Sequence, residues 1–173
     1  MKVNFTYYLR LFTILIIATN FSCQDDILGE INNDPALIEK LNANSSDTLK
    51  IENQKLILET EIYRNLTPGG GPFNRKDRRL TAPIWIVNVD STLIPQKLSV
   101  SKLYVINNNQ IWTSVPETNP ENTTPDYKSF FISKGGPEWK TGIYVDIVIS
   151  IIDLANNNEK FIIARNQIIT KVE

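Results

Sequence analysis

Hydrophobic and polar residues alternate in short segments along the chain beyond Thr48, and turn residues separate these segments. The clearest alternation runs through residues 143–153, where an isoleucine or valine stands at every second position from Ile143 to Ile151. A period of two is typical of a β-strand that buries one face, and no amphipathic helix fits this spacing. Residues 143–153 are therefore predicted to form a half-buried strand.

Strand patterns recur in five other segments: residues 55–63, 82–90, 103–115, 127–133 and 159–172. Residues 82–90 are apolar on both faces through Val87, which is typical of a central strand. Residues 107–109 (NNN) interrupt the third segment and predict a hairpin, because asparagine tolerates the positive φ that tight turns require. Residues 165–167 (RNQ) interrupt the last segment, so a bulge or a strand break is expected there.

These segments predict the fold class. About seven antiparallel strands over residues 48–173, without a long helical period or an internal repeat, favour an all-β, two-sheet β-sandwich. Within it, residues 139–147 (WKTGIYVDI) resemble the penultimate strand of immunoglobulin-like and fibronectin-like modules, and a terminal hairpin follows. The resemblance implies an immunoglobulin-like sandwich in which Tyr144 packs at a corner. The inter-sheet disulfide of antibody domains is absent, because the chain has one cysteine.

The first residues are predicted to direct the chain to the cell envelope. Residues 11–18 (LFTILIIA) form an apolar run that follows Lys2 and Arg10 and ends near the small residue Ser22. This order of a basic start, an apolar stretch and a small residue is typical of a secretory signal peptide, assigned here to residues 1–22. A permanent transmembrane helix is the weaker interpretation, because the run is about half of the ~20 residues that span a bilayer.

The single cysteine, Cys23, lies where a signal peptidase would cut. Residues 20–23 (NFSC) resemble the lipobox of bacterial lipoproteins, in which the thiol takes a diacylglycerol and the freed amine is acylated. The resemblance implies a palmitate-type lipid anchor on Cys23, and several acyl chains together hold a protein stably on a membrane. The alternatives are a plain cleaved signal and an incidental cysteine.

The residues after Cys23 carry a second resemblance. Gln24, Asp25 and Asp26 resemble the surface-export signal of Bacteroidetes lipoproteins, which implies an outer-membrane protein that faces outward. The alternative is a periplasm-facing protein whose aspartates only begin a solvated linker. Residues 23–47 are rich in Asn, Asp and Ser and are predicted to form a flexible tether. A short helix with Asp34 as its N-cap is compatible with this segment, but it is stable only if it docks.

Three segments extend the resemblance to small uncharacterised lipoproteins of Bacteroidetes: IWIVNVDS, LYVINNNQIW and GPEWKTGIYVDIV. That kinship implies no particular activity. The net charge is −1, from 18 basic and 19 acidic residues, and argues against a nucleic-acid partner. The absence of histidine removes the commonest general base and zinc ligand, so neither an enzyme nor a cofactor is expected.

Acidic residues also give little support to a metal or catalytic site. The spacing of acidic and amide residues over 153–159 does not match an EF-hand loop, and no metal site is predicted. Glu59 and Glu61 share one face of a predicted strand, where carboxylates usually only meet solvent, so a glycosidase pair is the weaker interpretation.

A basic loop is the first candidate binding site. Residues 69–72 (GGGP) precede four basic residues: Arg75, Lys76, Arg78 and Arg79. The loop lacks the Lys-Ser/Thr pair of a nucleotide-binding P-loop. Arginines on a loop are able to bind a carboxylate, a sulfate or a lipid phosphate through paired hydrogen bonds. The alternative is a solvated hairpin loop.

The three tryptophans form the second group of candidates. Trp85 is expected in the core because it lies on an apolar strand. Trp112 and Trp139 lie next to turn residues and are predicted to be half exposed, where an indole stacks on a sugar ring or anchors a protein interface. Packing in the core or at a corner remains the alternative for both.

Together these patterns predict a lipid-anchored, non-enzymatic binding or assembly module of the cell envelope. Its loops are expected to meet a protein or a glycan. Two alternatives remain: a structural accessory subunit of an outer-membrane complex, and an inhibitor of an external protease that uses the proline-containing loop at residues 116–125.

Overall fold

The computed structural model of the chain describes residues 29–66, 78–95, 98–118, 124–154 and 156–172. The predicted signal peptide (residues 1–22), Cys23 and the predicted export signal at Gln24, Asp25 and Asp26 lie outside these residues. Within these described residues, no helix has both the length and the hydrophobicity of a membrane span.

The described residues form one helix and twelve strands. In chain order these are β1 (Glu30–Asn32), α2 (Pro35–Asn44), β2 (Ser45–Ser46), β3 (Leu49–Ile51), β4 (Gln54–Thr60), β5 (Ile62–Asn65), β6 (Leu80–Asn88), β7 (Leu98–Asn107), β8 (Gln110–Ser114), β9 (Glu117–Thr118), β10 (Lys128–Ser133), β11 (Tyr144–Asp153) and β12 (Asn158–Val172). The all-β prediction is confirmed, and so is the hairpin β7–β8 with its asparagine turn, where Asn108 has a φ of 52°.

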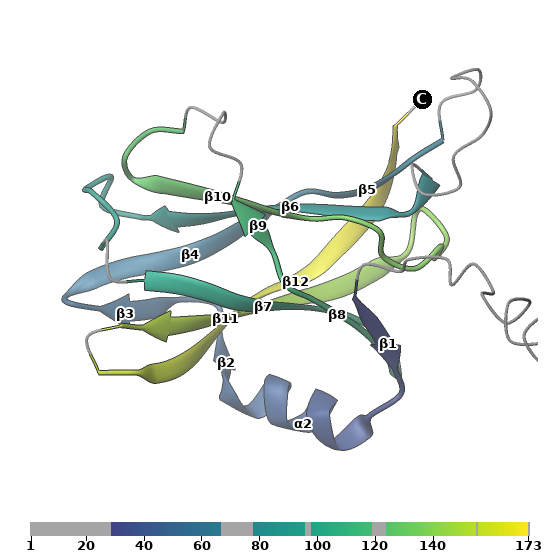
Figure 1. Cartoon of the computed structure of the whole chain (residues 1–173), viewed down its shortest axis with the longest axis horizontal. Coiled ribbons are helices and arrows are strands. Elements are labelled where there is room, and N and C mark those ends of the chain that lie inside the picture. Colours follow the sequence, from purple (N-terminus) through teal and green to yellow (C-terminus); the bar gives the residue numbers. More distant parts are fainter. Residues whose placement is uncertain (1–28, 67–77, 96–97, 119–123, 155, 173) are drawn as a thin grey trace, which may run out of the picture.

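The strands follow one hydrogen-bonded path in the order β1-β8-β7-β11-β12-β5-β6-β10-β9, with β2 beside β12 and β4 between β3 and β6. The first part of β12 pairs with β11, and its end pairs with β5, which also pairs with β6. The strands therefore form one curled, open sheet, a half-barrel with two facing halves (Figure 1). This differs from the predicted sandwich of about seven antiparallel strands, because β12 joins the halves and runs parallel to β2 and β5.

A bulge in β12 lies where the polar residues interrupt its apolar pattern. The register between β11 and β12 shifts between Val145 and Ile147, and Asn166 has a φ of 55°. The backbone N–H of Asn166 donates to Oδ1 of Asp146 at 2.8 Å. The predicted bulge is confirmed, whereas the strand continues through it. Because bulges bend strands, this one helps the long β12 to serve both halves of the sheet.

The main core lies between the two halves. Val145, Ile147 and Ile149 on β11 are buried, as their alternation predicts, and Leu56 and Leu58 face them from the other half. The expectation for Trp85 is wrong. Its neighbours Ile84 and Ile86 point into the core, so strand alternation turns Trp85 outward. There it is half buried against Phe130, with ring centroids 5.2 Å apart.

Residues 30–46, which we call the N-terminal strap, lie within the predicted tether but are structured. The predicted cap of α2 is confirmed, because Oδ1 of Asp34 accepts from the N–H of Leu37 at 3.0 Å. Leu41 is buried in a second apolar cluster on the outer face of β7, β8, β11 and β12. β1 and β2 pair with β8 and β12 at either end of the strap. The apolar residues on one face of α2 therefore dock this segment on the sheet, although its composition is mostly polar.

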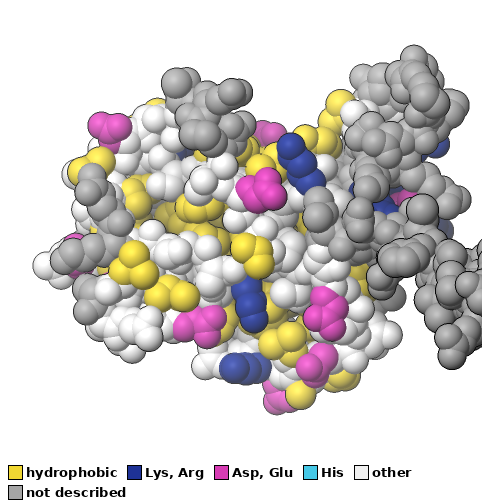
Figure 2. Space-filling view, in the orientation of Figure 1, with side chains coloured by type: hydrophobic (Ala, Val, Ile, Leu, Met, Phe, Trp, Pro, Cys, Tyr) yellow, Lys and Arg dark blue, Asp and Glu magenta, His cyan; other side chains and the backbone are white. Residues whose placement is uncertain are grey.

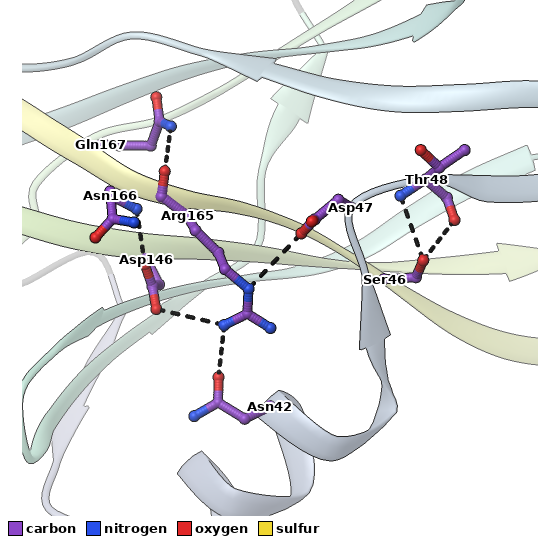
Figure 3. Close-up of polar contacts among 8 residues, drawn as sticks. All are labelled: Asn42, Ser46, Asp47, Thr48, Asp146, Arg165, Asn166 and Gln167. Atoms are coloured by element: carbon purple, nitrogen blue, oxygen red, sulfur yellow. Dashed lines mark hydrogen bonds and ion pairs between the residues drawn. The ribbon is translucent and has the colours of Figure 1, made fainter.

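Arg165 ties the strap to the bulge (Figure 3). Its Nε lies 3.7 Å from Oδ1 of Asp47, and its Nη1 lies 3.8 Å from Oδ2 of Asp146. Nη1 also donates to Oδ1 of Asn42 at 3.5 Å. The side chain thus links α2, the turn after β2 and β11. Because these groups are partly exposed, each contact alone contributes little stability.

Candidate ligand-binding site

A hollow lies beside the loop that leads into β11. Its volume is about 670 Å³, and it is lined by two aromatic rings, two amides, one carboxylate, one ammonium group and one aliphatic side chain: Trp139, Tyr144, Asn107, Asn108, Glu138, Lys140 and Ile143. Aromatic rings offer flat apolar surface, and the amide and charged groups offer hydrogen-bond donors and acceptors. The hollow therefore suits a ligand that has both apolar faces and polar edges.

Trp139 lies at the rim of this hollow in a fixed orientation. Its ring is half buried and packs against the main core. Its indole Nε1 donates to Oε1 of Gln110, the first residue of β8, at 2.9 Å. The prediction of a half-exposed Trp139 is confirmed, and the hydrogen bond prevents free rotation of the ring.

Arg64 holds the backbone of the same loop. Its Nη1 donates to the carbonyl oxygens of Glu138 at 3.2 Å and Trp139 at 3.0 Å, and its Nε donates to the carbonyl oxygen of Arg78 at 2.9 Å. The side chain is only 13% exposed and also lies 3.7 Å from Oε2 of Glu138. The rigid, forked guanidinium suits several acceptors at once. Sequence reasoning missed Arg64 as a site residue, because its acceptors on this loop lie far along the chain.

Trp112 packs against the loop that carries Trp139. The residue has no exposed surface, so the prediction of a half-exposed contact is wrong. A Cβ added to Gly136 would lie 2.8 Å from Cε3 of Trp112, and one added to Gly29 would lie 2.6 Å from its Nε1. The ring packs this closely because both neighbours lack a side chain. Gly136 also donates to the carbonyl oxygen of Leu80 at 3.0 Å, which fixes the loop on β6.

Tyr144 adds an exposed ring next to the hollow. The resemblance to immunoglobulin-like modules placed it at a packed corner, but its side chain is 65% exposed. Strand alternation explains the difference, since Val145 points into the core and Tyr144 therefore points outward. Its cross-strand neighbour Ile168 is also exposed. The two residues extend the apolar surface beside the hollow.

The basic loop is only partly described. Arg75 and Lys76 lie outside the described residues. Arg78 is exposed, whereas Arg79 is 7% exposed because it directly precedes the buried start of β6. Arg79 thus offers little surface to solvent, and ligand binding by the basic loop stays a prediction.

Other hollows lie along the open side between the two halves. One of about 430 Å³ lies between β8 and β10, and one of about 400 Å³ lies near Leu93 and Phe131. Figure 2 shows hydrophobic side chains in the trough between the halves, with basic and acidic side chains interspersed on the same face. Neither hollow contains a tryptophan, and the mixed charges give no single-sign surface.

Tyr104 and Lys128 have raised pKa values, and both lie away from the Trp139 hollow. Burial raises the pKa of Tyr104, and the nearby Glu159 carboxylate adds to the effect. The hydrogen bond from Lys128 to Glu59, with Nζ 2.6 Å from Oε2, raises the pKa of Lys128. Among the described residues, no group of three or more His, Cys, Asp or Glu side chains is placed to hold a metal ion.

The chain matches no known family model, no curated protein and no solved structure.

Proposed function

We propose that the protein is a non-enzymatic binding module of the cell envelope and that the hollow beside Trp139 binds a saccharide. The fixed Trp139 ring carries this proposal. Arg64 holds its backbone, Gln110 holds its indole and Trp112 supports its loop. A site that is ordered before binding loses less conformational entropy when a ligand arrives.

The chemistry of the hollow favours a saccharide over a protein surface. Its volume of about 670 Å³ lies in the range of small-ligand sites, roughly 300 to 1,000 Å³. A sugar ring has a C–H face that stacks on an aromatic ring and hydroxyl groups that bond to amides and carboxylates. Trp139 and Tyr144 supply the rings, and Asn107, Asn108 and Glu138 supply the polar partners.

The anchoring part of the proposal comes from the sequence. The lipobox-like residues before Cys23 support lipidation, and the acidic residues after it support an outward-facing position on the outer membrane. The likeness to immunoglobulin-like modules remains a proposal for the terminal hairpin β11–β12 alone. A protein partner is favoured by a different surface, the outer face of β6 and β10.

The saccharide proposal is tested with the detergent-solubilised full chain on a glycan array. We expect Trp139→Ala and Tyr144→Ala each to weaken binding at least tenfold, about 1.4 kcal/mol, because each removes a stacking surface. Leu154→Ala is the matched control, since Leu154 is 60% exposed and lies past the opposite end of β11. Equal binding by all three variants, or no binding by the wild-type chain, would disprove the proposal.

A second candidate function is an accessory subunit of an envelope complex. It is favoured by the outer face of β6 and β10, where Trp85 and Phe130 are half buried and no described helix covers them. The outer face of β7, β8, β11 and β12 differs, because α2 covers it. Cross-linking in cells tests this function, and one stoichiometric protein neighbour that is lost in Trp85→Ala would favour it.

The protease-inhibitor alternative has less support. Pro116 is buried and Glu117–Thr118 form β9, which pairs with β10, so the first part of the predicted inhibitory loop is built into the sheet. Residues 119–123 of that loop lie outside the described residues.

A further inference from the structure

The start of the described chain lies close to the loop that carries Trp139. Gly29 and Gly136 both lie against the ring of Trp112, as the added Cβ distances of 2.6 Å and 2.8 Å indicate. One indole ring therefore separates Gly29 from the loop that carries Trp139. In Figure 1 the chain enters β1 at the same end of the molecule as the loop that precedes β11.

The docked strap shortens the link between Cys23 and the body of the protein. A tether of residues 23–47 would reach about 85 Å when extended, at roughly 3.5 Å per residue. Because β1 begins at Glu30 and pairs with β8, only residues 24–28 separate Cys23 from Gly29. The greatest reach from Cys23 to Gly29 is about 20 Å. If Cys23 carries the acyl chains, the Trp139 hollow stays near the surface of the anchoring membrane.

We propose that the saccharide bound beside Trp139 is the headgroup of a glycolipid in the same membrane that anchors the chain. This inference rests on the proposed function and adds the source of the ligand. A glycolipid headgroup lies at the membrane surface, and a link of about 20 Å keeps the protein near that surface. Confinement of both partners to one membrane raises their effective concentration, so a weak site is sufficient.

The charges at the rim agree with a headgroup that carries phosphate or carboxylate. Lys140 is exposed at the hollow and has no ion-pair partner among the described residues. Glu138 is instead paired with Arg64, which reduces its repulsion of an anion. A soluble envelope polysaccharide has the same sugar chemistry, so the experiment must separate the two sources.

Site-specific photo-cross-linking in intact cells separates them. A photoreactive residue replaces Thr141, which is half buried next to Lys140, in the full chain, and the control replaces Leu154 at the other end of β11. We expect position 141, and not position 154, to capture a glycan-bearing species that extracts with lipids. Capture of lipid-free polysaccharide at position 141 would overturn this inference but leave the saccharide function in place. Capture of protein alone, equal capture at both positions or no capture would also overturn it.

A spacer tests whether glycolipid capture depends on the distance between the hollow and the membrane. A helical insertion of eight EAAAK repeats between Asp26 and Ile27 adds about 60 Å, at roughly 1.5 Å per residue. We expect glycolipid capture at position 141 to fall at least tenfold, whereas the same spacer after Glu173 should leave it unchanged. Binding of the captured glycolipid in detergent should be equal in both. Undiminished capture with the first spacer would contradict the inference.

The mass of the N-terminal peptide from the same cells separates this inference from the proposed function. An acylated Cys23 is expected. A bare thiol would remove the anchor and with it this inference, whereas saccharide binding by the solubilised chain would still stand.

Discussion

Trp112 and Trp139 stand in similar sequence surroundings but have opposite roles in the structure. Trp112 lies on β8, in register with Ile31 of β1 and Val105 of β7, and is fully buried. Trp139 lies in a loop without a strand partner and is held by side chains at the edge of a hollow. The difference shows that neighbours without side chains, such as Gly136, let an indole enter the core. Trp112 should therefore matter for stability and Trp139 for binding.

The largest effect is expected from Trp112→Ala. Removing a fully buried tryptophan should lower the free energy of unfolding by about 3 to 5 kcal/mol, because the core loses contacts and gains a cavity. Chemical denaturation measures this change. Trp139→Ala should cost less than about half as much, since its ring is only half buried. Equal losses for the two variants would show that the contrast between these residues is wrong.

Gly136→Ala should have the next largest effect. The new Cβ would lie 2.8 Å from the Trp112 ring, so the loop or the ring must move, at a cost of about 1 to 3 kcal/mol. Gly142→Ala is the matched control, because its Cβ meets nothing within 4 Å and its cost comes only from a φ of 82°. We expect saccharide affinity to fall in Gly136→Ala and to stay near wild type in Gly142→Ala. Unchanged affinity in the first variant would argue against support of the loop by Trp112.

Two arginines separate an effect on binding from an effect on the rest of the fold, because Arg64 holds the site loop and Arg165 holds the strap. Arg64→Met removes the donors to the loop carbonyls and should weaken saccharide binding about tenfold, or 1.4 kcal/mol. Arg165→Met removes the contacts to the strap and should leave binding unchanged. Calorimetric titration of both variants measures the difference. A similar loss of affinity in both would mean that Arg64 has no special role at the site.

The smallest effect is expected at the cap of α2. Asp34→Ala removes the acceptor for the N–H of Leu37 and should destabilise the helix by about 0.5 to 1 kcal/mol. Hydrogen exchange should become faster in residues 35–44, whereas the amides of β11 should keep their protection. Faster exchange throughout both segments would mean that the strap and the sheet open together.

Local patterns in the sequence predicted much of the fold. Alternation predicted β11, apolar strand patterns predicted β6, β10 and β12, the polar interruption predicted the bulge, and Asp34 predicted the helix cap. The curled sheet could not be predicted, because β12 pairs with β5 and β2 across long stretches of chain. The ordered structure of the strap was not predicted, because its few apolar residues stabilise it only by packing on the outer face of the folded sheet.

The site was predictable only in part. Trp139 has a local signal, an aromatic residue in a loop rich in glycine and proline. Arg64 has none, since its acceptors at Glu138 and Trp139 are 74 and 75 residues away in the chain. The burial of Trp112 depends on Gly29 and Gly136, and no local pattern indicates that these two glycines meet one ring.

The indole N–H resonances of the three tryptophans, followed by NMR, show whether the hollow beside Trp139 binds a saccharide. The full chain in detergent is titrated with oligosaccharides released by mild acid from the envelope of the producing cells, and each resonance is assigned by substitution. We expect the Trp139 resonance to shift and saturate while those of Trp85 and Trp112 remain in place. A shift of Trp85 alone, or no shift of Trp139 at saturating oligosaccharide, would contradict the assignment of this hollow as the binding site.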